Sequence, residues 1–351
     1  MNAYDIVKPL LFSLPAETAH SLGHRVVGLA GNAPIDRALA RHYAVDDPRL
    51  RVDALKQSFP NPVGVAAGFD KNAEAARGLA ALGFGFVEVG GVTAVPQSGN
   101  QRPRMFRLRA DDAVINRMGL NNDGAEAVGE RLADLDAPVP VGVNVAKSEH
   151  VDTAGAPADY LATYEEVAAG GDFFVVNVSC PNSQGFEELQ NREAMTAILT
   201  ELQDAGAAPL LIKLSPDLPE PAVADTLDLI TELGLDGVVA TNTSTERPDT
   251  LESPNRVETG GLSGAPIEAR ATEMTRFVAE RVDVPVIGVG GVATAEDAYR
   301  KIRAGASLVQ LYTAFLYRGP SIAREINLGL LELLERDGFD SVEAAVGADL
   351  D

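Results

Sequence analysis

Cysteine is almost absent from this sequence, because Cys180 is the only one among 351 residues. An intrachain disulfide is therefore excluded, and the thiol must serve either packing or chemistry. Histidine is scarce as well. His20 and His24 lie four residues apart with no third ligand near them, and His42 and His150 stand alone. We therefore expect no metal site.

Basic residues are few relative to acidic ones. Six lysines and 23 arginines stand against 51 Asp and Glu, which gives a formal net charge of −22 and a pI near 4.5. A general nucleic-acid-binding protein needs a basic face, so this class is excluded. Acidic excess with so few lysines is typical of a halophilic protein, whose charged surface stays soluble in strong salt. An ordinary acidic cytosolic protein is the alternative.

Long hydrophobic runs are also missing. No stretch of 18 apolar residues exists, and the N-terminus does not have the pattern of a cleavable signal. We therefore expect no membrane-spanning helix and place the protein inside the cell by default. Hydrophobic residues still make up 46% of the chain, which is typical of a globular protein with a large core.

What the sequence does contain is a repeat of short β-branched runs with helix-period segments between them. Eight β–α alternations over about 250 residues predict a (β/α)8 TIM barrel. A doubly wound open sheet is the alternative, although no GxGxxG follows the first strand. The predicted strands are residues 63–66, 84–89, 139–145, 173–178, 210–214, 237–240, 286–289 and 308–311. The clearest helices are predicted over residues 71–82, 193–205, 219–233 and 265–281.

Two parts of the chain fall outside this repeat. Residues 105–108 and 114–116 predict a hairpin inserted after the second strand. Helices predicted over 4–13 and 16–30 close the N-terminal face of the barrel, form a packing hairpin, or rest at a membrane surface. We therefore expect three parts: an N-terminal helical extension (1–44), the barrel (45–337) and an acidic C-terminal tail (338–351) that is frayed.

The most informative motif is the hexapeptide NVSCPN at 177–182, directly after an apolar run that is typical of a buried parallel strand. Asn177 and Asn182 flank Cys180, and amides can read the donors and acceptors of a planar polar ligand. A thiol with an unperturbed pKa of about 8.5 can act as a base. Most lone cysteines are small buried hydrophobes. The position at a strand's carboxyl end favours a catalytic base here.

Polar residues and glycines follow the other predicted strands, where the active sites of such barrels lie. Lys213 stands inside an apolar strand, where a buried charge needs an anion or an acidic partner. Gly290 and Gly291 follow the seventh strand, a place where barrels bind phosphate on backbone amides. The pattern predicts two ligands, a phosphorylated cofactor and a small planar anion.

Together these motifs resemble the dihydroorotate dehydrogenase family over nearly the whole chain. The segments that carry the likeness are 64–71, 116–120, 177–182, Lys213, 241–243, 259–264 and 289–291. Ala19-His20 and residues 104–108 resemble the quinone-dependent, membrane-associated class. The resemblance implies a barrel that carries FMN and oxidises dihydroorotate to orotate in pyrimidine (UMP) biosynthesis. It also implies a membrane quinone as electron acceptor and a peripheral position, through residues 1–44, on the cytoplasmic side of the cell membrane.

The resemblance also implies a role for each matching position, with Cys180 as the catalytic base. The substrate contacts it implies are Lys71, Asn116, Arg117, Met118, Gly119, Leu120, Asn177, Asn182, Asn242 and Thr243. The FMN contacts it implies are Ala67, Gly68, Gly91, Asn144, Asn177, Lys213, Thr241, Gly264, Gly290, Gly291, Tyr312 and Thr313. The quinone contacts it implies are His20, Arg107 and Tyr312.

Two positions depart from the quinone class. That class ordinarily has serine where Cys180 stands, whereas cysteine is the base in the soluble class linked to fumarate or NAD. It also has threonine, in contact with FMN, where Gly91 stands. The same oxidation with a soluble acceptor is therefore the nearest alternative. More distant alternatives are a flavin-free phosphate-binding barrel isomerase or synthase, and a ligand-binding barrel without catalysis.

Overall fold

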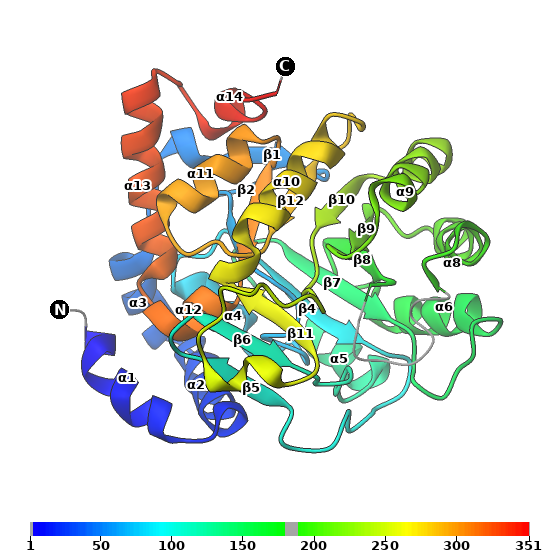
Figure 1. Cartoon of the computed structure of the whole chain (residues 1–351), viewed down its shortest axis with the longest axis horizontal. Coiled ribbons are helices and arrows are strands. Elements are labelled where there is room, and N and C mark those ends of the chain that lie inside the picture. The colour runs from blue at the N-terminus through cyan, green and yellow to red at the C-terminus, as the bar shows by residue number, and fades with distance from the viewer. Residues whose placement is uncertain (1–2, 180–188, 351) are drawn as a thin grey trace.

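A closed barrel of eight parallel strands forms the centre of the molecule (Figure 1). The computed structural model describes residues 3–179 and 189–350. Around the barrel the strands follow chain order, and the last pairs with the first, Leu311 opposite Val65. The strands are β3 (Val63–Val65), β4 (Phe86–Val92), β7 (Val141–Ala146), β8 (Phe173–Asn177), β9 (Leu210–Leu214), β10 (Gly237–Ala240), β12 (Val286–Val289) and β13 (Leu308–Leu311). This confirms the predicted (β/α)8 barrel.

All eight barrel strands are buried along their whole length, because one face lines the barrel and the other packs against helices. This explains their continuous apolar runs, and the bounds of the last four strands agree with the prediction. The outer helices are α4 (Ala76–Ala81), α5 (Ala125–Ala133), α6 (Ala156–Val167), α8 (Arg192–Asp204), α9 (Glu220–Leu233), α10 (Glu268–Ala279), α11 (Ala295–Arg303) and α13 (Ile322–Asp337).

Helix α4 is shorter than the helix predicted over 71–82. The carboxylate of Asp70 accepts hydrogen bonds from the backbone N–H groups of Glu74 (2.9 Å) and Ala75 (2.7 Å). These bonds hold residues 71–75 in a loop, so the helix begins only at Ala76. The loop keeps Lys71 at the carboxyl end of β3. The segment predicted as one helix over 265–281 is divided into a 3-10 turn, η3 (Ala265–Ile267), and α10.

A small antiparallel sheet lies over the carboxyl ends of the barrel strands. The predicted hairpin forms β5 (Met105–Leu108) and β6 (Ala113–Asn116), and a third strand, β11 (Gly261–Gly264), pairs with β6. The third strand was not predicted, because its glycines give it little β-propensity. A side chain at Gly260 would lie 2.3 Å from the backbone oxygen of Asn116, so glycine lets the two segments approach.

The N-terminal extension contains α1 (Ala3–Ser13), α2 (Ala16–Ala30) and α3 (Ile35–Tyr43). In Figure 1 the first two helices, in blue, lie beside β5 and β6. The ring of His20, on α2, contacts Phe69 and Tyr312, which follow β3 and β13. Helices α1 and α2 are thus at the carboxyl-terminal side of the barrel, whereas α3 ends beside Gly83, which precedes β4. The alternative that the helices predicted over 4–13 and 16–30 close the opposite face is wrong.

Residues 338–350 of the acidic tail are ordered, so the expectation that this segment is frayed is wrong. It contains the short helix α14 (Val342–Ala345), in which both Val342 and Ala345 are buried. Arg303 donates to Asp349 through Nε at 2.9 Å, and its backbone oxygen accepts from the N–H of Asp349 at 3.0 Å. The reason is local: two apolar side chains and an ion pair hold a segment whose composition alone indicated disorder.

Within residues 3–179 and 189–350, the structure contains no helix with both the length and the hydrophobicity that a membrane span requires.

Candidate active site

A cavity of about 350 Å³ lies between the carboxyl ends of the barrel strands and the β5–β6–β11 sheet. It brings together most of the residues that the sequence predicts for a site. Those that line it are Ala67, Gly68, Lys71, Gly91, Asn116, Met118, Gly119, Leu120, Asn144, Asn177, Lys213, Thr241, Asn242, Thr243, Gly264, Gly290, Gly291, Tyr312 and Thr313. Parallel strands place their ends at one rim, so residues far apart in sequence meet there.

Some predicted residues are placed elsewhere. The side chain of Arg117 donates to Glu258 (2.9 Å) and stacks on the Phe106 ring, outside the cavity lining. Arg107 donates to the backbone oxygens of Leu11 (3.2 Å) and Leu14, so its guanidinium holds the end of α1. Cys180 and Asn182 lie outside the described residues.

The floor of the cavity is a charged pair inside the barrel. The Lys213 Nζ lies 3.6 Å from Glu88 Oε1, and Glu88 is the acidic partner that the buried lysine requires. Asn144 Nδ2 donates to the same carboxylate at 2.7 Å, and Gln310 Nε2 donates to its other oxygen at 2.7 Å. Sequence reasoning missed Glu88. The signal was available, since a glutamate inside a buried strand is as unusual as a lysine.

A row of amides continues from this floor along the wall. Asn177 Nδ2 donates to Asn144 Oδ1 at 3.0 Å, and Asn242 Nδ2 donates to the Ser179 hydroxyl oxygen at 3.0 Å. Asn242 Nδ2 also lies 3.5 Å from Asn177 Oδ1. The buried Tyr160 hydroxyl fixes the backbone oxygen of Asn177 at 2.8 Å. Each amide is oriented by the next, so their remaining donors and acceptors are preorganised for a planar polar ligand.

Lys71 provides a positive charge at the other end of the cavity. Its ammonium donates to the backbone oxygen of Gly68. Burial lowers the pKa of Lys71 to about 8, with a further lowering from the nearby charge of Arg104, while Asp70 and Glu17 oppose the change. A pKa of about 8 leaves the side chain mostly charged at neutral pH, so it can bind an anionic ligand group.

Glycines and hydroxyl groups surround the end of the cavity at β12 and β13. Gly290 and Gly291 have φ of +118° and +74°, which few other residues adopt. The hydroxyls of Ser263 and Thr313 lie 2.8 Å apart, and Arg318 also lines this end. Sequence reasoning missed Ser263 and Arg318, which only the fold brings here. Backbone amides and hydroxyls suit a phosphate group, whereas the Arg318 guanidinium donates to Glu325 at 2.9 Å.

The cavity has room for a flat ring system between its two ends. A side chain at Gly68 would point into open space, with the nearest atom, on Tyr312, 4.0 Å away. A side chain at Gly91 would lie 3.2 Å from Asn144 Oδ1 and 2.9 Å from Leu120. Glycine at these positions keeps the space clear. The donor set and the cleared space therefore fit a phosphorylated planar cofactor.

The wall nearest the extension is aromatic. His20 stacks on Tyr312, with ring centroids 5.9 Å apart, and meets Phe69 edge-on at 5.3 Å. Burial lowers the pKa of His20 well below its ordinary value, and the charges of Lys71 and His24 act in the same direction. Its Nδ1 is buried without a hydrogen-bond partner among the described residues. The neutral imidazole of His20, with its Nδ1 available for a hydrogen bond, thus stacks on Tyr312, which lines the cavity.

Comparison with known proteins identifies the family. The family model for dihydroorotate dehydrogenase matches residues 49–334. A "Dihydroorotate dehydrogenase (quinone)" from Haloarcula marismortui is 73% identical over 350 residues, which is 100% of this chain and of that protein. One from Halobacterium salinarum is 61% identical over 348 residues, covering 99% and 100%.

Solved structures are also similar. The crystal structure of a ligand-free DHODH from Eimeria tenella has a TM-score of 0.86 at 37% identity and covers 94% of this chain and 99% of that chain. The structure of the same protein with ferulenol has a TM-score of 0.85 at 37% identity, covering 94% and 95%.

Proposed function

This chain belongs to the dihydroorotate dehydrogenase family, and we propose that it oxidises dihydroorotate to orotate with FMN as cofactor and quinone as electron acceptor. The observation that carries the proposal is the cavity, where an anion-binding lysine, oriented amides and a phosphate-suited end meet. The acceptor rests on relatives that bear the name "(quinone)" and match the whole chain, N-terminal extension included. Full-length similarity favours quinone over the soluble acceptors that cysteine at position 180 suggests.

The residues of the cavity fit FMN. Its phosphate would be held by the end that contains Gly264, Gly290, Gly291 and Thr313, and its ring system would be held by Lys213. The chemistry that FMN supplies when bound is acceptance of a hydride from C6 of dihydroorotate and delivery of the electrons to quinone. A positive charge on Lys213 at the edge of the ring system favours added negative charge there.

The remaining steps belong to side chains of this protein. The charged ammonium of Lys71 binds the substrate carboxylate. The amides of Asn116, Asn177 and Asn242, which line the cavity, orient the pyrimidine ring. Cys180, proposed from its sequence motif, removes the proton from C5 as the hydride leaves C6, which completes the loss of two hydrogens.

Quinone is proposed to approach from the N-terminal extension. His20 and Tyr312 offer ring and hydrogen-bonding groups on that side, and the guanidinium of Arg107 holds α1 in place. Exposed apolar side chains on the same helices, Ile6, Val7, Leu10, Leu22, Val26 and Leu29, support peripheral contact with the cytoplasmic side of the membrane. The proposed division of the chain is therefore a quinone-facing and membrane-facing extension of residues 1–44, an FMN-binding barrel of residues 45–337 and a C-terminal tail of residues 338–351.

Two measurements test the proposed function. Purified protein should be yellow and show a flavin absorption spectrum, which a flavin-free barrel isomerase would lack. Turnover of dihydroorotate should be faster with a short-chain quinone than with fumarate or NAD. Faster turnover with fumarate or NAD would assign the chain to the soluble-acceptor alternative instead.

A further inference from the structure

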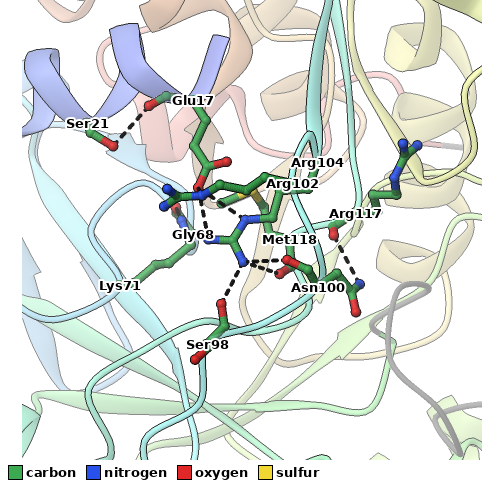
Figure 2. Close-up of polar contacts among 10 residues, drawn as sticks. All are labelled: Glu17, Ser21, Gly68, Lys71, Ser98, Asn100, Arg102, Arg104, Arg117 and Met118. Atoms are coloured by element: carbon green, nitrogen blue, oxygen red, sulfur yellow. Dashed lines mark hydrogen bonds and ion pairs between the residues drawn. The ribbon is translucent and has the colours of Figure 1, made fainter. Parts of the chain in front are cut away.

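A buried ion pair joins the N-terminal extension to the roof of the cavity (Figure 2). Glu17, in the first turn of α2, accepts hydrogen bonds at Oε1 from Arg104 Nε (3.1 Å) and Nη2 (2.9 Å). The side chains of Arg104 and Glu17 are only 5% and 16% exposed. Arg102 donates to the same oxygen at 3.0 Å, but its side chain is 73% exposed. The Glu17–Arg104 pair is thus the sequestered part of this cluster.

The other edge of the Arg104 guanidinium holds backbone oxygens. Its Nη1 donates to Ser98 (2.6 Å), Asn100 (3.0 Å) and Met118 (3.4 Å). Asn100 supports the same loop, because its N–H donates to the oxygen of Met118 and its Nδ2 to the oxygen of Arg117, both at 3.0 Å. Met118 lines the cavity at the position proposed to contact substrate. One side chain therefore ties α2 to the substrate-binding loop.

Lys71 lies next to this cluster, as Figure 2 shows. Besides burial, the charged groups that face its ammonium act in opposite directions: Arg104 lowers the pKa of Lys71, whereas Asp70 and Glu17 raise it. His20 also faces Lys71, but burial keeps it neutral. The negative charge of Glu17 thus offsets the positive charge of Arg104 beside Lys71, the lysine that is proposed to bind the substrate carboxylate.

We propose that Glu17 and Arg104 are positioning residues for dihydroorotate, so that the N-terminal extension acts on the substrate side of the site as well as on the quinone side. Without Glu17, Arg104 is a buried cation without its partner and no longer held against the loop carbonyls. Its charge then also repels Lys71 more strongly. The assignment rests on the proposed function, since dihydroorotate is the ligand that Lys71 and the loop receive.

The test is equilibrium binding of orotate to the full-length, FMN-loaded protein, followed by the change in flavin absorption. Glu17→Gln and Arg104→Gln should each weaken orotate binding by about tenfold or more at pH 7. Arg102→Gln is the matched control, because it removes a donor to the same carboxylate oxygen at an exposed position. Its orotate affinity should stay within about twofold of wild type.

The pH dependence separates an electrostatic role from a structural one. Orotate binding weakens as pH rises through the pKa of Lys71, because the charged form binds the carboxylate. Glu17→Gln removes a negative charge that favours the charged form of Lys71, so orotate binding should begin to weaken at a lower pH than in the wild type. Arg104→Gln removes a positive charge that disfavours the charged form of Lys71, so orotate binding should begin to weaken at a higher pH. Opposite shifts would not result from a loosened fold.

The outcomes are distinguishable. If the wild type binds orotate and the two variants bind it equally well, or their pH dependences do not shift in opposite directions, the assignment is wrong while the proposed function stands. If the wild type does not bind orotate, the proposed function fails and this assignment with it. If Glu17→Gln does not retain flavin, Glu17→Asp is used in its place. Glu17→Asp keeps the negative charge, so its orotate binding should have the wild-type pH dependence.

Discussion

Lys213 and Glu88 face each other inside the barrel with 3.6 Å between Nζ and Oε1, and their side chains are 6% and 0% exposed. The separation is longer than that of a direct hydrogen bond, and the strong donors to Glu88 are the amides of Asn144 and Gln310 at 2.7 Å. The carboxylate therefore compensates the lysine's charge, while the lysine lines the cavity and can turn its N–H groups toward a ligand.

Glu88→Gln should destabilise the protein and change the bound flavin. Removing one partner of a buried pair leaves Lys213 uncompensated, which costs about 3–5 kcal/mol of unfolding free energy. With less negative charge beside the ring system, the midpoint potential of the flavin should become more positive. Chemical denaturation and a redox titration measure the two effects. Glu88→Asp, which keeps the charge, is the control, and an unchanged potential in Glu88→Gln would contradict the role given to this pair.

Substitution of the two cavity lysines should affect different ligands, the substrate for Lys71 and the flavin for Lys213. Lys71→Ala should retain FMN but bind dihydroorotate poorly, whereas Lys213→Ala should lose flavin or slow its reduction. In the wild type, dihydroorotate affinity should decline as pH rises through about 8, because Lys71 then loses its charge. Lys71→Ala should lack this decline. Unchanged flavin content and unchanged kinetics in both variants would mean that neither lysine has its proposed role.

Cys180→Ala should leave FMN bound and slow flavin reduction by dihydroorotate by roughly 10²–10⁴. Single-turnover stopped-flow absorbance measures this step without the quinone reaction. Cys180→Ser should keep some activity with an optimum at higher pH, because a hydroxyl is a weaker acid than a thiol. Reduction at the wild-type rate in the alanine variant would exclude Cys180 as the base.

Stability should rise with salt. At a net charge of −22, carboxylates on the surface repel one another, and the Debye length falls from about 10 Å at 0.1 M salt to about 3 Å at 1 M. The Tm, followed by circular dichroism, should therefore increase from low to molar KCl. Potassium sulfate and KCl at equal ionic strength separate charge screening from salting-out. A Tm that is the same at low and molar KCl would contradict the halophilic interpretation.

The sequence by itself determined the barrel and most of the cavity lining. Buried parallel strands need continuous apolar runs, so each strand can be predicted from its own segment of the sequence. Because the active sites of barrels lie at the carboxyl ends of the strands, the residues that follow each predicted strand, such as Lys71, Asn144 and Lys213, are then the candidates for the site. The same reasoning found the hairpin at 105–116, because alternation along a strand is also a local pattern.

Only the tertiary structure decided which residues meet. Glu88 as the partner of Lys213 and Glu17 as the partner of Arg104 join residues far apart in the chain. The third strand, β11, and the ordered tail depend in the same way on neighbours from elsewhere. Periodicity and propensity report the environment of one segment, whereas a pairing depends on which segments the closed barrel brings side by side.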